Sequence, residues 1–92
     1  MPQADLHADL EEAALEEMER ACDLGWARIA AVTPWGDIYE GYTPAGRDVC
    51  FERNYLWKDE PGYDIVVEVV VYEPRDYEQG VRLMRELPRA VH

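Results

Sequence analysis

The sequence predicts an α+β fold, a four-stranded antiparallel meander flanked by an N-terminal and a C-terminal helix (α-β-β-β-β-α), as one domain over residues 1–92. Apolar residues recur at helical spacing up to residue 24, recur with a period of two between residues 26 and 74, and return to helical spacing after Pro74. A chain of 92 residues can bury one two-layer core of this kind.

The first predicted helix covers residues 4–24. Its apolar residues fall within one arc at about 100° per residue, with Leu15 at the margin of Leu6, Leu10, Ala14, Met18, Ala21 and Cys22. The opposite side is predicted to be polar and carries Asp5, Asp9, Glu12, Glu16, Glu19 and Asp23. Alanine, leucine, glutamate and methionine favour helix, and Gly25 is a natural stop after Leu24.

Four strands are predicted next, at residues 26–33, 37–43, 48–57 and 63–74. Short segments rich in glycine and proline join them, including the turn at 34–37 (Pro-Trp-Gly-Asp) and the turns at 44–47 and 58–62. Connections this short favour antiparallel neighbours, because parallel neighbours need long crossovers. In the third strand Val49, Phe51, Tyr55 and Trp57 share one face.

A second helix is predicted after Pro74. Asp76 and Gln79 have the spacing of a capping box. The apolar residues that follow recur at helical intervals, at Tyr77, Val81, Met84, Leu87 and Val91, and Pro88 is expected to end or kink the helix.

The segment 63–74, YDIVVEVVVYEP, is apolar on both faces. Ile65, Val67, Val69 and Val71 lie on one face, whereas Val66, Val70 and Tyr72 lie on the other with Glu68. If both helices pack on the first face, the second is exposed, and a homodimer that stacks Val66, Glu68, Val70 and Tyr72 against a second copy would cover it. If the helices cover opposite faces instead, the monomer is complete.

Glu68 is the one ionisable residue in this apolar strand. It could be a buried acid with a raised pKa, a ligand contact, a charge that blocks sheet aggregation, or the partner of an arginine across the sheet. We expect the last role, with Arg53 or Arg28 as the arginine.

The net charge of −11 restricts the classes of partner. Residues 1–23 hold eight acids against Arg20 alone, whereas residues 75–92 have a slight excess of arginine. Binding to nucleic acid or to an anionic membrane needs a basic face, so neither is expected. A basic protein partner remains open, with an inhibitor that mimics nucleic acid as the sharpest version, and so does a role of the charge in solubility alone.

The residue types disfavour catalysis. Serine is absent, the histidines are His7 and His92, and neither Cys22 nor Cys50 lies in a recognisable nucleophile turn. We expect both cysteines to be buried thiols. His7 with Glu11, and Glu12 with Glu16, have helical spacing that could offer ligands, but the patterns of a closed metal site are missing. We therefore predict no enzyme activity, no metal and no cofactor.

Aromatic residues are the best candidates for recognition. They lie in or near the turns and middle strands, and the binding set is Trp35, Tyr39, Tyr42, Tyr55 and Trp57. Trp35, in the Pro-Trp-Gly-Asp turn, is the first candidate for an exposed anchor.

Two functions are expected from these observations. The first is a small acidic, non-enzymatic interaction module that forms a homodimer and binds a protein partner. The alternative is a small-molecule binding protein with a Tyr/Trp-lined pocket between sheet and helices. A location in the cytoplasm is expected, because the sequence shows neither a membrane span nor a signal pattern.

Overall fold

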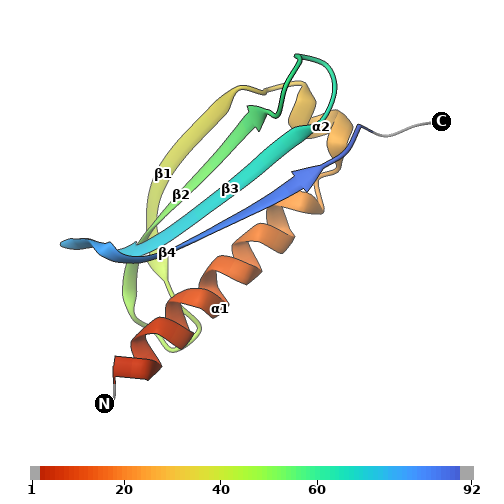
Figure 1. Ribbon diagram of the computed structural model, residues 1–92. Helices are drawn as coiled ribbons and strands as arrows, with labels where there is room; N and C mark the ends of the chain where they lie inside the picture. The colour runs from red at the N-terminus through yellow and green to blue at the C-terminus, as the bar shows by residue number, and fades with distance from the viewer. Residues whose placement is uncertain (1–2, 90–92) are drawn as a thin grey trace.

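The computed structural model describes residues 3–89, and the side chains of residues 6–89. A long helix and a short helix precede four strands (Figure 1). The bounds of the elements are α1 (Gln3–Cys22), α2 (Trp26–Ala30), β1 (Trp35–Tyr42), β2 (Asp48–Trp57), β3 (Ile65–Glu73) and β4 (Asp76–Leu87). The order in the described chain is therefore α-α-β-β-β-β.

The strands form one antiparallel sheet in the order β1-β2-β3-β4. This confirms a four-stranded antiparallel meander, but residues 76–87 supply one strand in place of the predicted strand at 26–33. β2 pairs with β1 on one side and with β3 on the other, and β3 also pairs with β4. Phe51 lies opposite Tyr39 and Val71, and Val69 lies opposite Arg53 and Leu83. Opposed residues share a face, so this register decides which side chains gather on each side of the sheet.

The predicted first strand, residues 26–33, is wrong. This segment begins with the five-residue helix α2, whose Ile29 is fully buried. Ala27 and Ala30 are strong helix formers, and Gly25, at φ 85°, turns the chain between the helices in a conformation that favours glycine. A short apolar run fits a strand and a buried helical turn equally well by periodicity.

The predicted C-terminal helix is also wrong, because residues 76–87 form the edge strand β4. Helical spacing would place Tyr77 and Met84 in the core, but both are more than half exposed. Val81, Leu83 and Leu87 share an inner face at a period of two and pack on the core. Backbone pairing with β3 outweighs the weak local preference for helix. Of the positions used in that prediction, Val91 lies outside the described residues.

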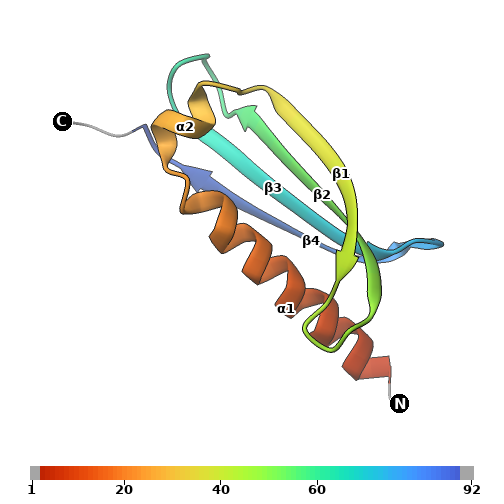
Figure 2. The same cartoon turned by 180° about the vertical axis from the view of Figure 1, so that it is seen from behind.

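α1 runs along one side of the sheet, and the two views show it from front and back (Figures 1 and 2). Its inner residues Leu10, Ala14 and Met18 pack with the sheet side chains that share its core. The core members contributed by the strands are Val49, Phe51, Tyr55, Ile65, Val67, Val69, Val71 and Val81. These positions confirm the inner faces predicted for residues 48–57 and 63–74.

Two acids of α1 lie on its buried side. Asp9 is 8% exposed and Glu17 is 1% exposed. The prediction for Asp9 was wrong, because it was placed with the outer acids. Leu15, placed at the margin of the apolar arc, is 43% exposed. The side chain of Asp5 lies outside the described residues.

Candidate interaction surface

The side of the sheet away from α1 is the main candidate for a functional surface. We call it the uncovered face; it consists of the even-numbered residues of β1, β2 and β3, and of Arg82, Met84 and Glu86 in β4. Within residues 3–89, neither helix packs against this face, since the core that α1 joins contains the odd-numbered strand residues (Figure 2).

Large apolar side chains stand exposed on the uncovered face. Ile38 is 61% exposed, Leu56 is 47% exposed and Met84 is 57% exposed, and they come from three different strands. Val70, near the middle of the face, is only 5% exposed because it lies between neighbouring strands. The register places Glu52, Asn54 and Glu68 among these three residues, so apolar and polar side chains are interspersed over the face. Protein–protein interfaces commonly have such a mixed composition.

The four residues predicted for a dimer interface all lie on the uncovered face. Val66, Glu68, Val70 and Tyr72 alternate along β3, an inner strand of the sheet. Their place on an uncovered face agrees with the pattern read from the sequence. Their role in an interface stays a prediction.

Glu68 pairs with an arginine across the sheet, as expected, but the arginine is Arg82 on β4. Nε of Arg82 donates to Oε2 of Glu68, and Nη2 of Arg82 forms an ion pair with the same oxygen; the carboxylate also accepts a hydrogen bond from Nδ2 of Asn54 at 2.8 Å. Neither Arg53 nor Arg28 is the partner. Arg82 is absent from the predicted partners because the sequence predicts a helix for its segment.

Tyr72 and Tyr77 form an aromatic pair at one end of the uncovered face, with ring centroids 4.8 Å apart in an edge-on arrangement. Burial raises the pKa of the Tyr72 hydroxyl to about 12, and the neighbouring carboxylate of Glu52 adds to the rise. Tyr72 is therefore a neutral hydrogen-bond donor at every physiological pH.

The five aromatic binding candidates do not line one pocket. Trp35 stacks on Tyr55 with ring centroids 4.8 Å apart, and Tyr39 stacks on Phe51 at 5.3 Å, all on the side of the sheet that faces α1. Trp57 packs against the core on that same side. Tyr42, which is 71% exposed, lies on the uncovered face. Trp35 is 37% exposed, so one edge of this side chain is accessible.

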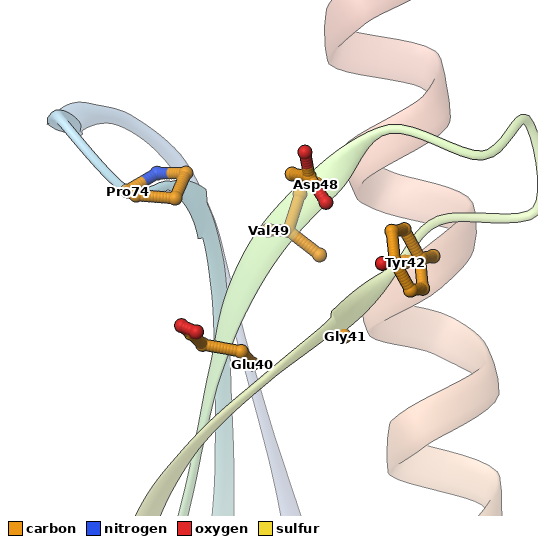
Figure 3. A pocket seen from close by; sticks show the side chains of 6 residues that line it. All are labelled: Glu40, Gly41, Tyr42, Asp48, Val49 and Pro74. Carbon is orange, nitrogen blue, oxygen red and sulfur yellow. The ribbon is translucent and has the colours of Figure 1, made fainter.

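Two hollows lie where the β1–β2 and β3–β4 turns approach each other. The first, of about 430 Å³, lies between Pro74 and the ends of β1 and β2 (Figure 3); its lining is Glu40, Gly41, Tyr42, Asp48, Val49 and Pro74. The second, of about 610 Å³, shares Asp48 and Pro74 and adds Gly46, Arg47, Glu73 and Arg75. Of the predicted aromatic set, Tyr42 alone contributes to these hollows.

A buried ionic cluster joins α1 to the other side of the sheet. The carboxylate of Glu17 accepts hydrogen bonds from Arg53 on β2, from Arg20 on α1 and from the hydroxyl of Tyr39 on β1. Burial alone would raise the pKa of Glu17, but these three donors outweigh it and hold the pKa below its ordinary value. Burial, together with the Glu17 carboxylate, raises the pKa of Tyr39 to about 12.

Sequence reasoning missed this cluster, although a signal for it was present. Glu17 follows Ala13 by four residues and precedes Ala21 by four, so it lies within the buried stripe. Asp9 lies four residues before Ala13 and belongs to the same row. In that position an acid needs a fixed partner, and Arg53 is the base at the matching place on the inner face of β2.

In the described part of the chain, no three histidine, cysteine or acidic side chains gather as metal ligands would. Cys22 and Cys50 are half-buried free thiols. Nε2 of His7 lies 3.7 Å from Oε2 of Glu11 on the exposed side of α1. His92 lies outside the described residues. Over residues 3–89 no helix has the length and apolar character needed to cross a bilayer.

Comparison with known proteins gives no relative: no family model, no curated protein and no solved structure matches this chain.

Proposed function

We propose that this protein is a non-enzymatic interaction module that forms a homodimer through the uncovered face and presents its acidic helix to a protein partner. The observation that carries the proposal is the uncovered face itself. It leaves Ile38, Leu56 and Met84 in water on one surface, and a second copy would remove all three from water at once.

The charge at the centre of the uncovered face supports burial against another protein. The Glu68 side chain is only 13% exposed, and Arg82 and Asn54 already satisfy its carboxylate within the same chain. Burying an unpaired carboxylate is costly, whereas burying a paired and hydrogen-bonded one costs much less. Stacking a second sheet here would therefore not leave Glu68 without a partner.

The size of the face also fits a dimer. Four strands of about ten residues cover roughly 30 by 19 Å, or about 550 Å² of projected area per chain. Two such faces together bury about 1,100 Å², which clears the roughly 1,000 Å² minimum for a biological interface but lies below the roughly 1,200–2,000 Å² of most stable ones.

The edge of the sheet is a weaker candidate for self-association. β1 is an edge strand, but the amide of its Ile38 donates to Oδ1 of Asp37 at 2.9 Å. That amide is already occupied by its neighbour's side chain, so a strand added at this edge would have to displace it. We therefore assign self-association to the face and not to the β1 edge.

The outer side of α1 stays free in such a dimer and would present the acids to a basic protein. Its exposed acids are Glu11, Glu12, Glu16 and Glu19, and Arg20 is the only arginine or lysine of α1. Association with a basic partner through this surface would weaken as salt rises, because exposed charges are screened. The small-molecule alternative has less support, because the aromatic candidates are spread over both sides of the sheet.

The experiment compares two leucines of similar exposure on opposite sides of the molecule. Leu56, on the uncovered face, is 47% exposed, and Leu15, on the outer side of α1, is 43% exposed. Light scattering coupled to size exclusion should show that Leu56→Glu weakens the dimer at least tenfold while Leu15→Glu leaves it unchanged. Equal effects of the two substitutions, or none from Leu56→Glu, would contradict the assignment of the interface.

Val70→Glu is a poorer test. Val70 is nearly inaccessible within the face, so a charge there disturbs the sheet itself as well as a contact. Met84→Glu, at a residue that is 57% exposed, is the better second variant, and circular dichroism should show it to be folded.

A further inference from the structure

The charges of the uncovered face are divided unequally between its two halves. The half formed by β1 and β2 carries Glu40, Asp48 and Glu52 and no base on this face, since Arg53 of β2 lies on the inner face. In the described part of the chain none of these three carboxylates forms an ion pair. This half is therefore purely acidic.

The half formed by β3 and β4 carries the base. Arg82 binds Glu68 through Nε and Nη2, yet its side chain is 62% exposed. Its guanidinium has five N–H donors, so it can serve a second carboxylate as well. Glu86, the remaining acid of this half, is already paired with Nζ of Lys58 at 2.8 Å.

A two-fold dimer of stacked sheets has two simple arrangements. With the axis across the strands, the acidic half of one copy lies on the acidic half of the other, and six unpaired carboxylates face each other. With the axis along the strands, each acidic half lies on the partner's half that contains Arg82. Like charges that meet in an interface weaken association, so charge favours the second arrangement.

We propose that two copies stack with the two-fold axis parallel to the strands, so that Glu52 of each copy pairs with the partner's Arg82. This inference rests on the proposed function. Glu52 pairs with Val70 and Val70 pairs with Arg82, so the three residues form one row across the sheet. A two-fold axis parallel to the strands places this row over the same row of the partner. The backbones of Glu52 and of the partner's Arg82 are then about one strand spacing, or about 5 Å, apart within the sheet plane and about 10 Å apart between the sheets. Extended glutamate and arginine side chains span this separation.

The test is a mixing experiment with charge-reversed chains. Glu52→Arg alone and Arg82→Glu alone should each weaken self-association at least tenfold, because each places like charges opposite one another twice. An equimolar mixture should form a heterodimer at least tenfold tighter than either homodimer, since both oppositely charged pairs are then restored. Sedimentation velocity with one fluorescently labelled chain measures this. The matched control mixes Arg82→Glu with Glu19→Arg, a reversal on the outer side of α1. This heterodimer restores only one of the two pairs, so it should stay weaker than the Glu19→Arg homodimer.

A distance measurement serves if Arg82→Glu fails to fold. Ala45, in the exposed turn between β1 and β2, is changed to cysteine in a chain whose Cys22 and Cys50 are alanine, and carries a spin label. If the axis is parallel to the strands, both labels lie at the same end of the dimer and are less than about 25 Å apart. If the axis is perpendicular to the strands, the labels lie at opposite ends and are more than about 35 Å apart. A long distance, or a dimer whose charge-reversed mixture shows no gain, overturns this arrangement alone. A wild-type chain that stays monomeric overturns the proposed function as well.

Discussion

Glu17 on α1 and Arg53 on β2 form a buried ion pair across the interface between helix and sheet, with Nε of Arg53 donating to Oε2 of Glu17 at 2.8 Å. Their side chains are 2% and 16% exposed. The most acidic helix of the chain is thus attached to its sheet by a charge as well as by apolar contacts. This pair, with Asp9 near the start of the helix, fixes the side of α1 that faces the sheet.

Removing one member of the pair should be more harmful than removing both. Glu17→Ala is expected to lower the free energy of unfolding by about 3–5 kcal/mol, because it leaves the charge of Arg53 buried without a partner. The double variant Glu17→Met, Arg53→Met should be clearly more stable than Glu17→Ala. Urea unfolding followed by circular dichroism measures both. A loss below about 1 kcal/mol for Glu17→Ala would show that the pair is not held in the interior.

The pH dependence of stability follows from the lowered pKa of Glu17. Its ordinary value is 4.5, and the folded value lies below it. The stabilisation is therefore fully present above pH 4.5 and is lost as pH falls through the folded pKa. Thermal unfolding between pH 7 and pH 2.5 should show a steeper loss of stability on acidification for the wild type than for Glu17→Gln. Parallel curves for the two proteins would contradict this assignment.

The hydroxyl of Thr43 should stabilise the β1–β2 turn. It donates to Oδ2 of Asp9 and accepts a hydrogen bond from the amide of Arg47 at 3.0 Å, and Thr43 is only 4% exposed. Thr43→Val is expected to cost about 1–3 kcal/mol, because it leaves buried polar groups unsatisfied. Thr33, whose hydroxyl donates to the carbonyl of Ile29 in a more exposed setting, is the control. Thr33→Val should cost less in the same urea titration.

Arg89 should affect the environment of Trp26. Its guanidinium carbon lies 5.6 Å from the ring of Trp26 and 5.4 Å from that of Tyr63, and Nε1 of Trp26 donates to the carbonyl of Tyr63 at 2.7 Å. Arg89→Gln is expected to cost about 0.5–1 kcal/mol and to shift the tryptophan emission. Arg85→Gln, at an exposed residue of β4, is the control. Equal spectra for both variants would exclude the contact.

Local patterns predicted some elements of the fold and misassigned others. Residues 48–57 were predicted as a strand with the observed bounds, because Val49, Phe51, Tyr55 and Trp57 alternate clearly. Residues 76–87 contain helix formers at helical spacing, and only the unpaired edge of β3 decides that they form a strand. Such pairing is not local, so the periodicity of the segment alone cannot show it.

The candidate surface was predictable in part, because alternation within one strand can be read from the sequence but pairing between strands cannot. The apolar outer positions of β3, Val66, Val70 and Tyr72, follow directly from alternation. The exposed neighbours Ile38 and Met84 depend on the register of β1 and β4, and the pairing of Glu68 with Arg82 depends on the strand that replaced the expected helix. Since that helix does not form, the question of which face it covers has no counterpart in the described chain.

The most direct test of the central claim is the mass of the wild-type protein in solution. Sedimentation equilibrium between about 1 and 100 μM should give the mass of two chains, each of 10.7 kDa, with dissociation only toward the lowest concentrations. A mass of one chain throughout this range would contradict self-association through the uncovered face.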